Sequence, residues 1–291
     1  MIKPLGKFGS NSILPSFSQL GIGVYMFLVL FPLVAGLLYA LAYSLGLVGA
    51  LSKGFTLNHW QVVVGMPAIW KSFLLSLSIA SGVVLLAAML ALATVLLLHP
   101  YIRKTGSLVF FIPLGIPPMV AAFWGFHLLG DGGLLARFIQ KAFPFFTFPE
   151  LTNDAWHIGV ISVLVLLTYP FFCLQMLQAY HTQNVQGLMD IGKSLGGSRR
   201  YVLLRIGLPI LWKNALPSLV LFGVFLFGAY EVPLLLGRQA PQMISVLIAQ
   251  KFKRFDLEMV ARAYVLTVLY AGFVLAGIWF LFKRKKAGRG A

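Results

Sequence analysis

Charged residues and cysteine are both scarce in this chain. Only 10% of its 291 residues are charged, whereas soluble domains carry roughly 25%. This scarcity excludes an ordinary soluble domain. The single cysteine, Cys173, permits neither an internal disulfide nor a cysteine metal cluster. No segment combines basic residues with exposed aromatic residues on a polar background, which argues against nucleic-acid binding.

Apolar residues, by contrast, make up 59% of the chain and gather in six long runs. A membrane-spanning helix needs about 20 apolar residues, so each run is long enough to cross a bilayer. The first run is too long for the core of a signal peptide, which predicts an uncleaved first helix. The sequence therefore predicts an all-α membrane protein of about six transmembrane helices. The runs cover residues 20–48, 72–98, 107–130, 157–180, 210–237 and 259–282.

The basic residues divide unevenly between the two sides of this arrangement. One side holds fourteen of them against a single acid, Asp190, and the other holds nine against six acids. The positive-inside rule makes the first side cytoplasmic. Both termini are then cytoplasmic, which agrees with an even number of spans, since such a number puts both termini on one side. The fourteen residues are Lys3, Lys7, Arg103, Lys104, Lys193, Arg199, Arg200, Arg205, Lys213, Lys283, Arg284, Lys285, Lys286 and Arg289.

Residues 187–194 read GLMDIGKS and match the phosphate-binding pattern G-x-x-x-x-G-K-[ST]. That pattern works only after an apolar strand and before a helix. Here the preceding residues, LQAYHTQNVQ, are polar, and Gly196 and Gly197 would interrupt the helix that must follow. We therefore interpret Gly187–Ser194 as a chance match, with no nucleotide site and no ATP hydrolysis by this chain itself.

Residues 181–209 form the longest predicted cytoplasmic connection. Their composition predicts a helix, a Gly-Gly-Ser turn at 196–198 and a second helix that ends at Pro209. Tyr201, Leu204 and, less regularly, Ile206 and Leu208 are expected to be packed, while Arg200 and Arg205 stay exposed to solvent. Two interpretations are open from composition alone: a compact element presented to a cytoplasmic partner, and an ordinary basic loop.

Within this loop, Asp190 is followed at fixed spacing by Gly196, Ile206 and Leu208-Pro209. The spacing resembles the signature of permease subunits of binding-protein-dependent ABC importers: Glu-Ala-Ala, Gly six positions after the Glu, Ile ten further on, then one residue and Leu-Pro. The opening triplet departs from it, because Asp shortens the reach and the Gly at 192 is expected to loosen the helix. We expect Asp190 near the start of that helix, where the dipole favours an acid. The coupling residues implied are Asp190, Ile191, Gly192, Leu195, Gly196, Ser198, Arg199, Ile206, Leu208 and Pro209.

The resemblance covers roughly residues 70–282 and implies the type I ABC importer permease fold. It divides the chain into an N-terminal tail, first helix and outer segment (1–69), a five-helix core (70–283) and a basic tail (284–291). It implies a non-catalytic subunit, without cofactor or metal ion, in the bacterial cytoplasmic (inner) membrane. The implied partners are a cytoplasmic ABC ATPase dimer, a second, non-identical permease, and a periplasmic or lipid-anchored solute-binding protein.

The end of the fifth run, FGAYEVPLLLGRQAPQMISVLIAQKF, resembles permeases for polyamines and, more loosely, those for sulfate, ferric iron and thiamine. The expected cargo is a polyamine such as spermidine or putrescine, with the other three as alternatives. Glu231 is the most deeply embedded acid and would suit a cation, although an interfacial pair with Arg238 is the other interpretation. The remaining pathway candidates, for which a packing role is the alternative, are Tyr230, Phe225, Phe227, Trp124 and His127.

Two other classes of protein account less well for these features. A secondary transporter or channel without an ATPase would need ion-coupling residues within its spans, and beyond Glu231 and His127 there are almost none. An intramembrane enzyme would need a metal motif or a buried nucleophile with a base. The five histidines are scattered, so neither arrangement is evident.

Overall fold

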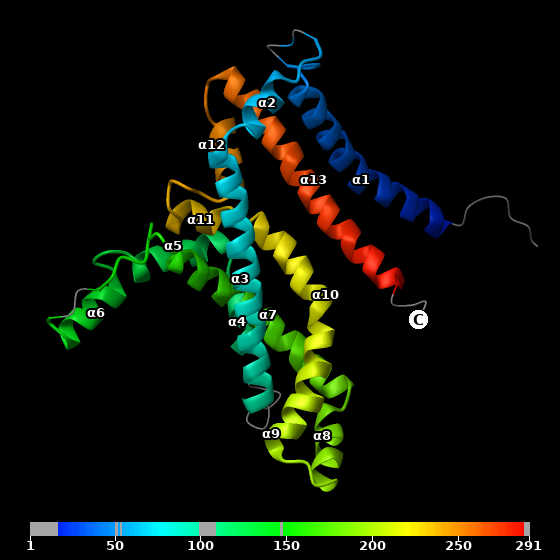
Figure 1. Ribbon diagram of the computed structural model, residues 1–291, viewed down its shortest axis with the longest axis vertical. Helices are drawn as coiled ribbons and strands as arrows, with labels where there is room; N and C mark the ends of the chain where they lie inside the picture. The colour runs from blue at the N-terminus through cyan, green and yellow to red at the C-terminus, as the bar shows by residue number, and fades with distance from the viewer. Residues whose placement is uncertain (1–16, 50–51, 53, 99–108, 146–147, 288–291) are drawn as a thin grey trace, which may run out of the picture.

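The computed structural model describes residues 17–49, 52, 54–98, 109–145 and 148–287 (Figure 1). These residues form helices, with no strand among them. Six helical segments are long and apolar enough to cross a membrane, which confirms the predicted all-α fold. They are Gly21–Ser44, Pro67–Leu98, Pro118–Ala142, Ile158–Thr182, Arg199–Phe227 and Leu257–Trp279. Six of the residues used for the orientation lie outside the described part of the chain: Lys3, Lys7, Lys53, Arg103, Lys104 and Arg289.

One to three short helices separate each long helix from the next along the chain (Figure 1). The long ones are α1 (Phe17–Ser44), α3 (Pro67–Leu98), α7 (Ile158–Thr182), α10 (Leu208–Phe227) and α13 (Leu257–Ala287). The short ones are α2 (Asn58–Val64), α4 (Phe111–Leu114), α5 (Pro118–Leu129), α6 (Leu134–Ala142), α8 (Val185–Ser194), α9 (Arg199–Val202), α11 (Glu231–Leu236) and α12 (Ile244–Phe252). Between α9 and α10 lies a π-helical turn, Leu203–Gly207.

The core of the bundle is a seam of small side chains on α3, the helix that packs against α7 and α10. These side chains are at most 1% exposed. Lipid is as apolar as the helices, so membrane helices associate chiefly through close packing, which small residues permit. The seam therefore positions α7 and α10 around α3. Its members are Ala80, Val83, Ala87, Ala88 and Ala91.

A second unit is formed by α1 and α13, which lie side by side (Figure 1). The ring of Tyr264 contacts Tyr43 with centroids 4.3 Å apart and Tyr39 with centroids 5.9 Å apart. At its end, α1 is tied to α2 by a hydrogen bond that Trp60 Nε1 donates to Ser44 Oγ over 3.3 Å. The first helix thus joins the rest of the chain through α13 and α2.

The third predicted span is interrupted. Within the predicted run 107–130, the chain breaks at residues 115–117, between α4 and α5. Pro117 has an extended ψ of 141°, and neither Pro117 nor Pro118 has an N–H to continue the hydrogen-bond ladder. The prolines therefore divide this apolar run into two helices.

The fifth predicted span, 210–237, also differs from the structure. Its helix ends at Phe227, and α11 starts at Glu231 after a short turn. At the other end, Pro209 does not end a helix as predicted, because α9, the π-helical turn and α10 follow one another from Arg199 onwards. The wider turn precedes Pro209 at the place where its ring would meet the Arg205 carbonyl in a regular α-helix.

Gly125 marks the closest approach of α5 to its neighbours. A Cβ built there would lie 2.6 Å from Val163 Cγ2 and 3.2 Å from Leu236 Cδ1. We expect Gly125→Leu to lower the melting temperature of the purified chain, because over-packing of this kind costs about 1–3 kcal/mol. Gly82→Leu on α3 is the matched control, since nothing lies within 4 Å of its Cβ position. Equal melting temperatures for the two variants would contradict this packing.

Candidate functional site

The connection between α7 and α10 projects from one end of the bundle and carries α8 and α9 (Figure 1). Gly196 has a φ of +85°, a conformation that side chains disfavour. Its N–H donates to the Lys193 carbonyl over 2.9 Å, and that of Gly197 donates to the Gly192 carbonyl over 3.0 Å. This pair of hydrogen bonds is the Schellman ending of a helix. The predicted helix followed by a Gly-Gly-Ser turn is confirmed.

Glycine residues also allow the two arms of the loop to pack closely. The first arm is α8, and the second begins with α9 and continues through the π-helical turn. A Cβ at Gly192 would lie 3.0 Å from Ile206 Cδ1 and 3.1 Å from Val202 Cγ2, and one at Gly197 would lie 2.9 Å from Val202 Cγ2. Val202 is 1% exposed in the space that these glycines leave. Gly192 was expected only to loosen the first helix. In the structure it lies within α8 and admits the second arm.

The packed face of the second arm differs from the predicted one. The expected packing of Ile206 and Leu208 is confirmed, since both pack against the core. Tyr201 and Leu204 were also expected to be packed, but each is 59% exposed, whereas Val202 is buried. The start of α9 explains the difference, because Ser198 Oγ accepts a hydrogen bond from the Tyr201 N–H over 3.3 Å. This cap fixes the first turn so that the next residue, Val202, faces α8.

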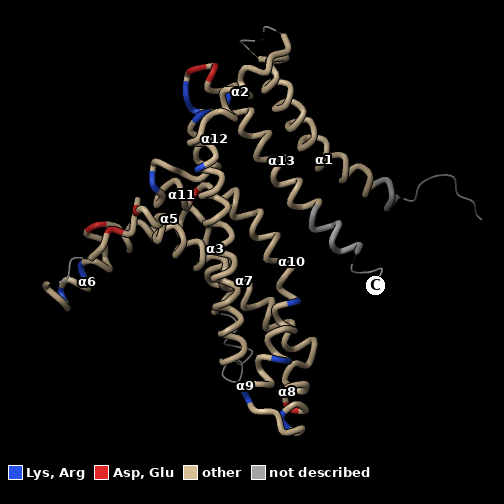
Figure 2. The backbone as a smooth tube through the Cα atoms, in the orientation of Figure 1, with Lys and Arg blue, Asp and Glu red and all other residues tan. Residues whose placement is uncertain are grey.

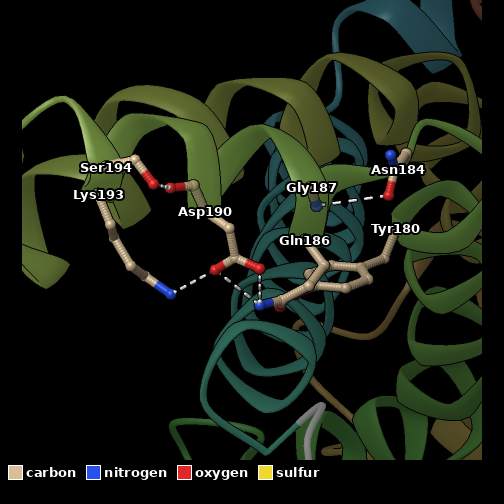
Figure 3. A network of polar contacts seen from close by, with 7 residues as sticks. All are labelled: Tyr180, Asn184, Gln186, Gly187, Asp190, Lys193 and Ser194. Carbon is tan, nitrogen blue, oxygen red and sulfur yellow. Dashed lines mark hydrogen bonds and ion pairs between the residues drawn. The ribbon is translucent and has the colours of Figure 1, made fainter.

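Asp190 lies at the centre of a polar network on α8 (Figure 3). Gln186 Nε2 donates to both carboxylate oxygens, over 3.1 and 2.9 Å, and Lys193 Nζ donates to Oδ1 over 2.8 Å. Tyr180, near the end of α7, donates its hydroxyl to Gln186 Oε1 over 2.5 Å. The Lys193 hydrogen bond, followed by that of Gln186, holds the pKa of Asp190 below its ordinary value. The network fastens α8 to the end of α7.

Asp190 does not lie near the start of its helix, so that prediction is wrong. The start is formed instead by Asn184, whose Oδ1 accepts from the Gly187 N–H over 3.4 Å. The stretch Gly187–Ser194 is helical throughout. Its amides therefore belong to the helix, and the stretch offers no loop that could wrap a phosphate.

Apolar side chains gather on the exposed surface of the loop. The most exposed is Leu195, at 84%, and the neighbouring arginines are exposed as well. An exposed apolar patch rimmed by polar residues marks an interaction site. We call this patch the loop tip; it comprises Leu188, Ile191, Leu195, Tyr201 and Leu204, and its rim comprises Arg199, Arg200 and Arg205.

Higher in the bundle, a cavity of about 490 Å³ lies beside both helix interruptions. Ile116 and Pro118 line it at the first break, and Ala229 and Glu231 line it at the second. Non-helical backbone within a membrane is tolerated where it lines a cavity. The other described lining residues are Pro113, Leu114, Leu164, Leu167, Thr168, Leu221, Phe222, Phe225, Leu226 and Val232.

Glu231 is the one charged side chain among the described residues that line this cavity. It is exposed and forms no ion pair with Arg238, since the two ion pairs of the described residues are Lys193–Asp190 and Arg262–Glu258. Thr168 and Leu221, from α7 and α10, line the same cavity and were not predicted. Apolar spans resemble one another in sequence, so no local pattern marks these two residues.

Phe227 and Tyr230 lie apart from the cavity lining. Phe227 is 2% exposed and stacks on Tyr270 with ring centroids 5.2 Å apart. It therefore packs in the core, which is the alternative role expected for it. The Tyr230 hydroxyl accepts a hydrogen bond from Lys253 Nζ over 3.4 Å.

Trp124 and His127 follow one another on α5 but do not line the first cavity. Trp124 is 63% exposed. His127 lines a second, polar cavity of about 400 Å³ together with Asp131, Arg137 and Glu150. No group of three or more potential ligands (His, Cys, Asp or Glu) is placed to hold a metal ion in the described part of the chain.

The Asp190 network predicts a specific titration behaviour. Because the pKa of Asp190 is lowered in the fold, the contribution of its contacts to stability is complete above the ordinary pKa. That contribution is lost as the pH falls through the lowered value. Lys193→Met should raise the pKa of Asp190 toward its ordinary value, whereas Lys213→Met, on α10, should not. Carbon-13 NMR of labelled aspartate carboxyls measures this pKa, and an unchanged value in Lys193→Met would contradict the network.

Comparison with known proteins supports the fold. No protein-family profile matches the sequence, and no curated protein does so either. The chain is similar to a chain in the crystal structure of a bacterial ABC transporter involved in the import of the acidic polysaccharide alginate, with 16% identity over 90% of this chain and 93% of that one and a TM-score of 0.66. It is also similar to one in the bacterial alginate ABC transporter in complex with alginate pentasaccharide-bound periplasmic protein, with 17% identity, 91% coverage of each chain and a TM-score of 0.67. The helices of this chain thus have the arrangement found in a bacterial ABC importer.

Proposed function

We propose that this chain is the permease subunit of an ATP-driven importer, and that its loop 181–209 couples it to a separate cytoplasmic ATPase. The observation that carries the proposal is the agreement between the ABC importer fold and the geometry of the loop. The spaced Gly196 occupies the positive-φ position of the turn between α8 and α9, and the exposed Leu195 of the loop tip directly precedes it. An ordinary basic loop would need neither feature.

The contacts of the loop suggest how movement would pass into the membrane. Tyr180 and Gln186 tie α8 to α7, and α9 continues through the π-helical turn into α10. Both α7 and α10 line the 490 Å³ cavity, for example through Thr168 and Phe225. A displacement of the loop tip by a closing ATPase dimer would move both walls of the cavity as rigid elements. This chain would transmit the movement to the cavity walls, and its partner would hydrolyse the ATP.

The remaining parts of the proposal concern assembly and location. The side with the larger basic excess, including the loop and both termini, would face the cytoplasm. The chain would lie in the bacterial inner membrane, with residues 70–283 as its permease core, 1–69 in front of that core and 284–291 as a basic tail. A second, non-identical permease would complete the pathway. A periplasmic or lipid-anchored binding protein would deliver the solute, as a periplasmic protein is bound in one similar structure.

For the cargo, we propose a cation of the polyamine class. Glu231 supports this choice, because it places a single carboxylate in a cavity that is otherwise lined mainly by apolar residues. Sulfate, ferric iron and thiamine are the other cargoes of similar permeases. The similar solved transporter imports an acidic polysaccharide, so an anionic saccharide is included in the test below.

Gly196→Asp should abolish uptake while the protein stays in the membrane. The aspartate would be forced into a positive-φ turn beside the loop tip. The measurement is co-purification of an ATPase from native membranes in mild detergent, together with uptake of radiolabelled solute. Normal uptake by this variant would refute the coupling assignment.

Two further variants separate coupling from backbone strain. Gly132→Asp introduces the same residue at a φ of +67°, again with nothing within 4 Å of the Cβ position, but near α6 instead of the loop. The ATPase should still co-purify with this variant. Gly196→Asn should restore part of the uptake, because Asn tolerates positive φ better than most residues. If Gly132→Asp loses the ATPase as well, the effect comes from misfolding.

Glu231→Gln tests the cargo. If the solute is a cation, loss of the carboxylate should reduce uptake about tenfold or more, because hydrogen bonds to charged groups contribute about 1.5–3 kcal/mol. Uptake of spermidine, sulfate and an acidic oligosaccharide should be compared in the parent and the variant. Glu150→Gln, in the second cavity, is the matched control. An equal rate for every solute would leave Glu231 without a role in the pathway.

A further inference from the structure

Four cations gather where α12 is followed by α13, at the end of the bundle opposite to the loop tip (Figure 2). They are Lys251, Lys253, Arg254 and Arg262, and we call them the basic cluster. Figure 2 shows Lys and Arg and then Asp and Glu along this connection. The acids are Asp256 and Glu258, so the segment carries two more positive than negative charges.

Both acids already have partners. Asp256 Oδ1 accepts a hydrogen bond from the Glu258 N–H over 2.9 Å at the start of α13. Glu258 Oε2 forms an ion pair with an Arg262 Nη atom over 2.9 Å. Lys253 donates to a neutral group, the Tyr230 hydroxyl. The excess positive charge of the basic cluster is therefore not compensated by these two acids.

Two of the cations, Lys251 and Arg262, are partly buried, and Lys251 forms no ion pair among the described residues. Lys251 is half-buried, and its Nζ contacts Met259 Sδ at 3.9 Å. Burial lowers the pKa of Lys251, and so do the charges of Arg262 and Arg254. The Arg262 side chain is 20% exposed, and its Nε is buried without a hydrogen-bond partner. A partly buried cation without a counter-charge destabilises a fold, and a bound anion would offset this cost.

We propose that the basic cluster binds a phosphate group or an oxyanion of the same chemistry. Such a group has several acceptor oxygens and suits a guanidinium together with an ammonium. The position at the end of a span is consistent with a lipid headgroup, because Arg262 lies near the start of the segment Leu257–Trp279 and Phe255 is fully exposed beside it. A soluble oxyanion would meet the same partners. The proposal does not depend on coupling to an ATPase.

The test measures the melting temperature of the full-length chain, purified in a non-ionic detergent. One arm compares sodium phosphate with sodium chloride at equal ionic strength. The other compares short-chain phosphatidylglycerol with phosphatidylcholine. At about ten times its dissociation constant, a bound ligand should raise the melting temperature by about 2–3 °C. Lys251→Met should abolish this rise, and Lys141→Met, an exposed lysine on α6, should keep it.

Lys251→Met also has a signature that a merely structural lysine would lack. Without added ligand, the variant should melt at the same temperature as the parent or higher, because it removes an uncompensated charge. A rise with phosphatidylglycerol alone identifies a lipid, and a rise with phosphate alone identifies a soluble oxyanion. If Lys251→Met does not fold, the exposed Arg254→Gln takes its place. No rise in either arm, or an equal rise in the parent and the cluster variant, would overturn the proposal.

Discussion

Lipid offers no hydrogen-bond partner to a peptide group, and most of this structure follows from that constraint. A chain with so few charges can satisfy its backbone inside a bilayer only by forming helices, and all of the long apolar runs do so within the described residues. The small residues of α3 then allow α7 and α10 to pack closely. The two breaks, before Pro118 and after Phe227, both lie beside the 490 Å³ cavity. Non-helical backbone therefore occurs beside this cavity, where a pathway for a solute would require it.

The shape of the loop between α7 and α10 depends on three of its glycines. Gly196 provides a positive φ, while Gly192 and Gly197 leave room for Val202. The departure of Gly192 from the alanine of the signature thus has a packing reason in this chain. The shorter Asp190 is likewise held within α8 by Gln186 and Lys193. The loop is a compact unit whose apolar tip stays exposed, as docking on another protein requires.

The basic residues of this chain fall into two groups with different explanations. The positive-inside rule would account for the large excess on the side of the loop. The basic cluster near α12 lies on the other predicted side, where acids are more numerous. For the basic cluster, the partial burial of Lys251 and Arg262 supports anion binding more strongly than the number of basic residues does. Composition alone would have treated both groups as ordinary surface charge.

The sequence by itself determined the fold class, the number of spans, the turn at Gly196 and the loop in which it lies, because hydropathy, glycine content and spacing are local properties. It was wrong about Pro209, Tyr201 and the position of Asp190 in its helix, since a π-helical turn and two caps decided those points. Only the tertiary structure separated the buried Phe227 from the cavity-lining Glu231 and placed Lys251 beside Arg262. The direction in which a side chain of an apolar span points depends on which helices pack against it, and that information is distributed over the whole chain.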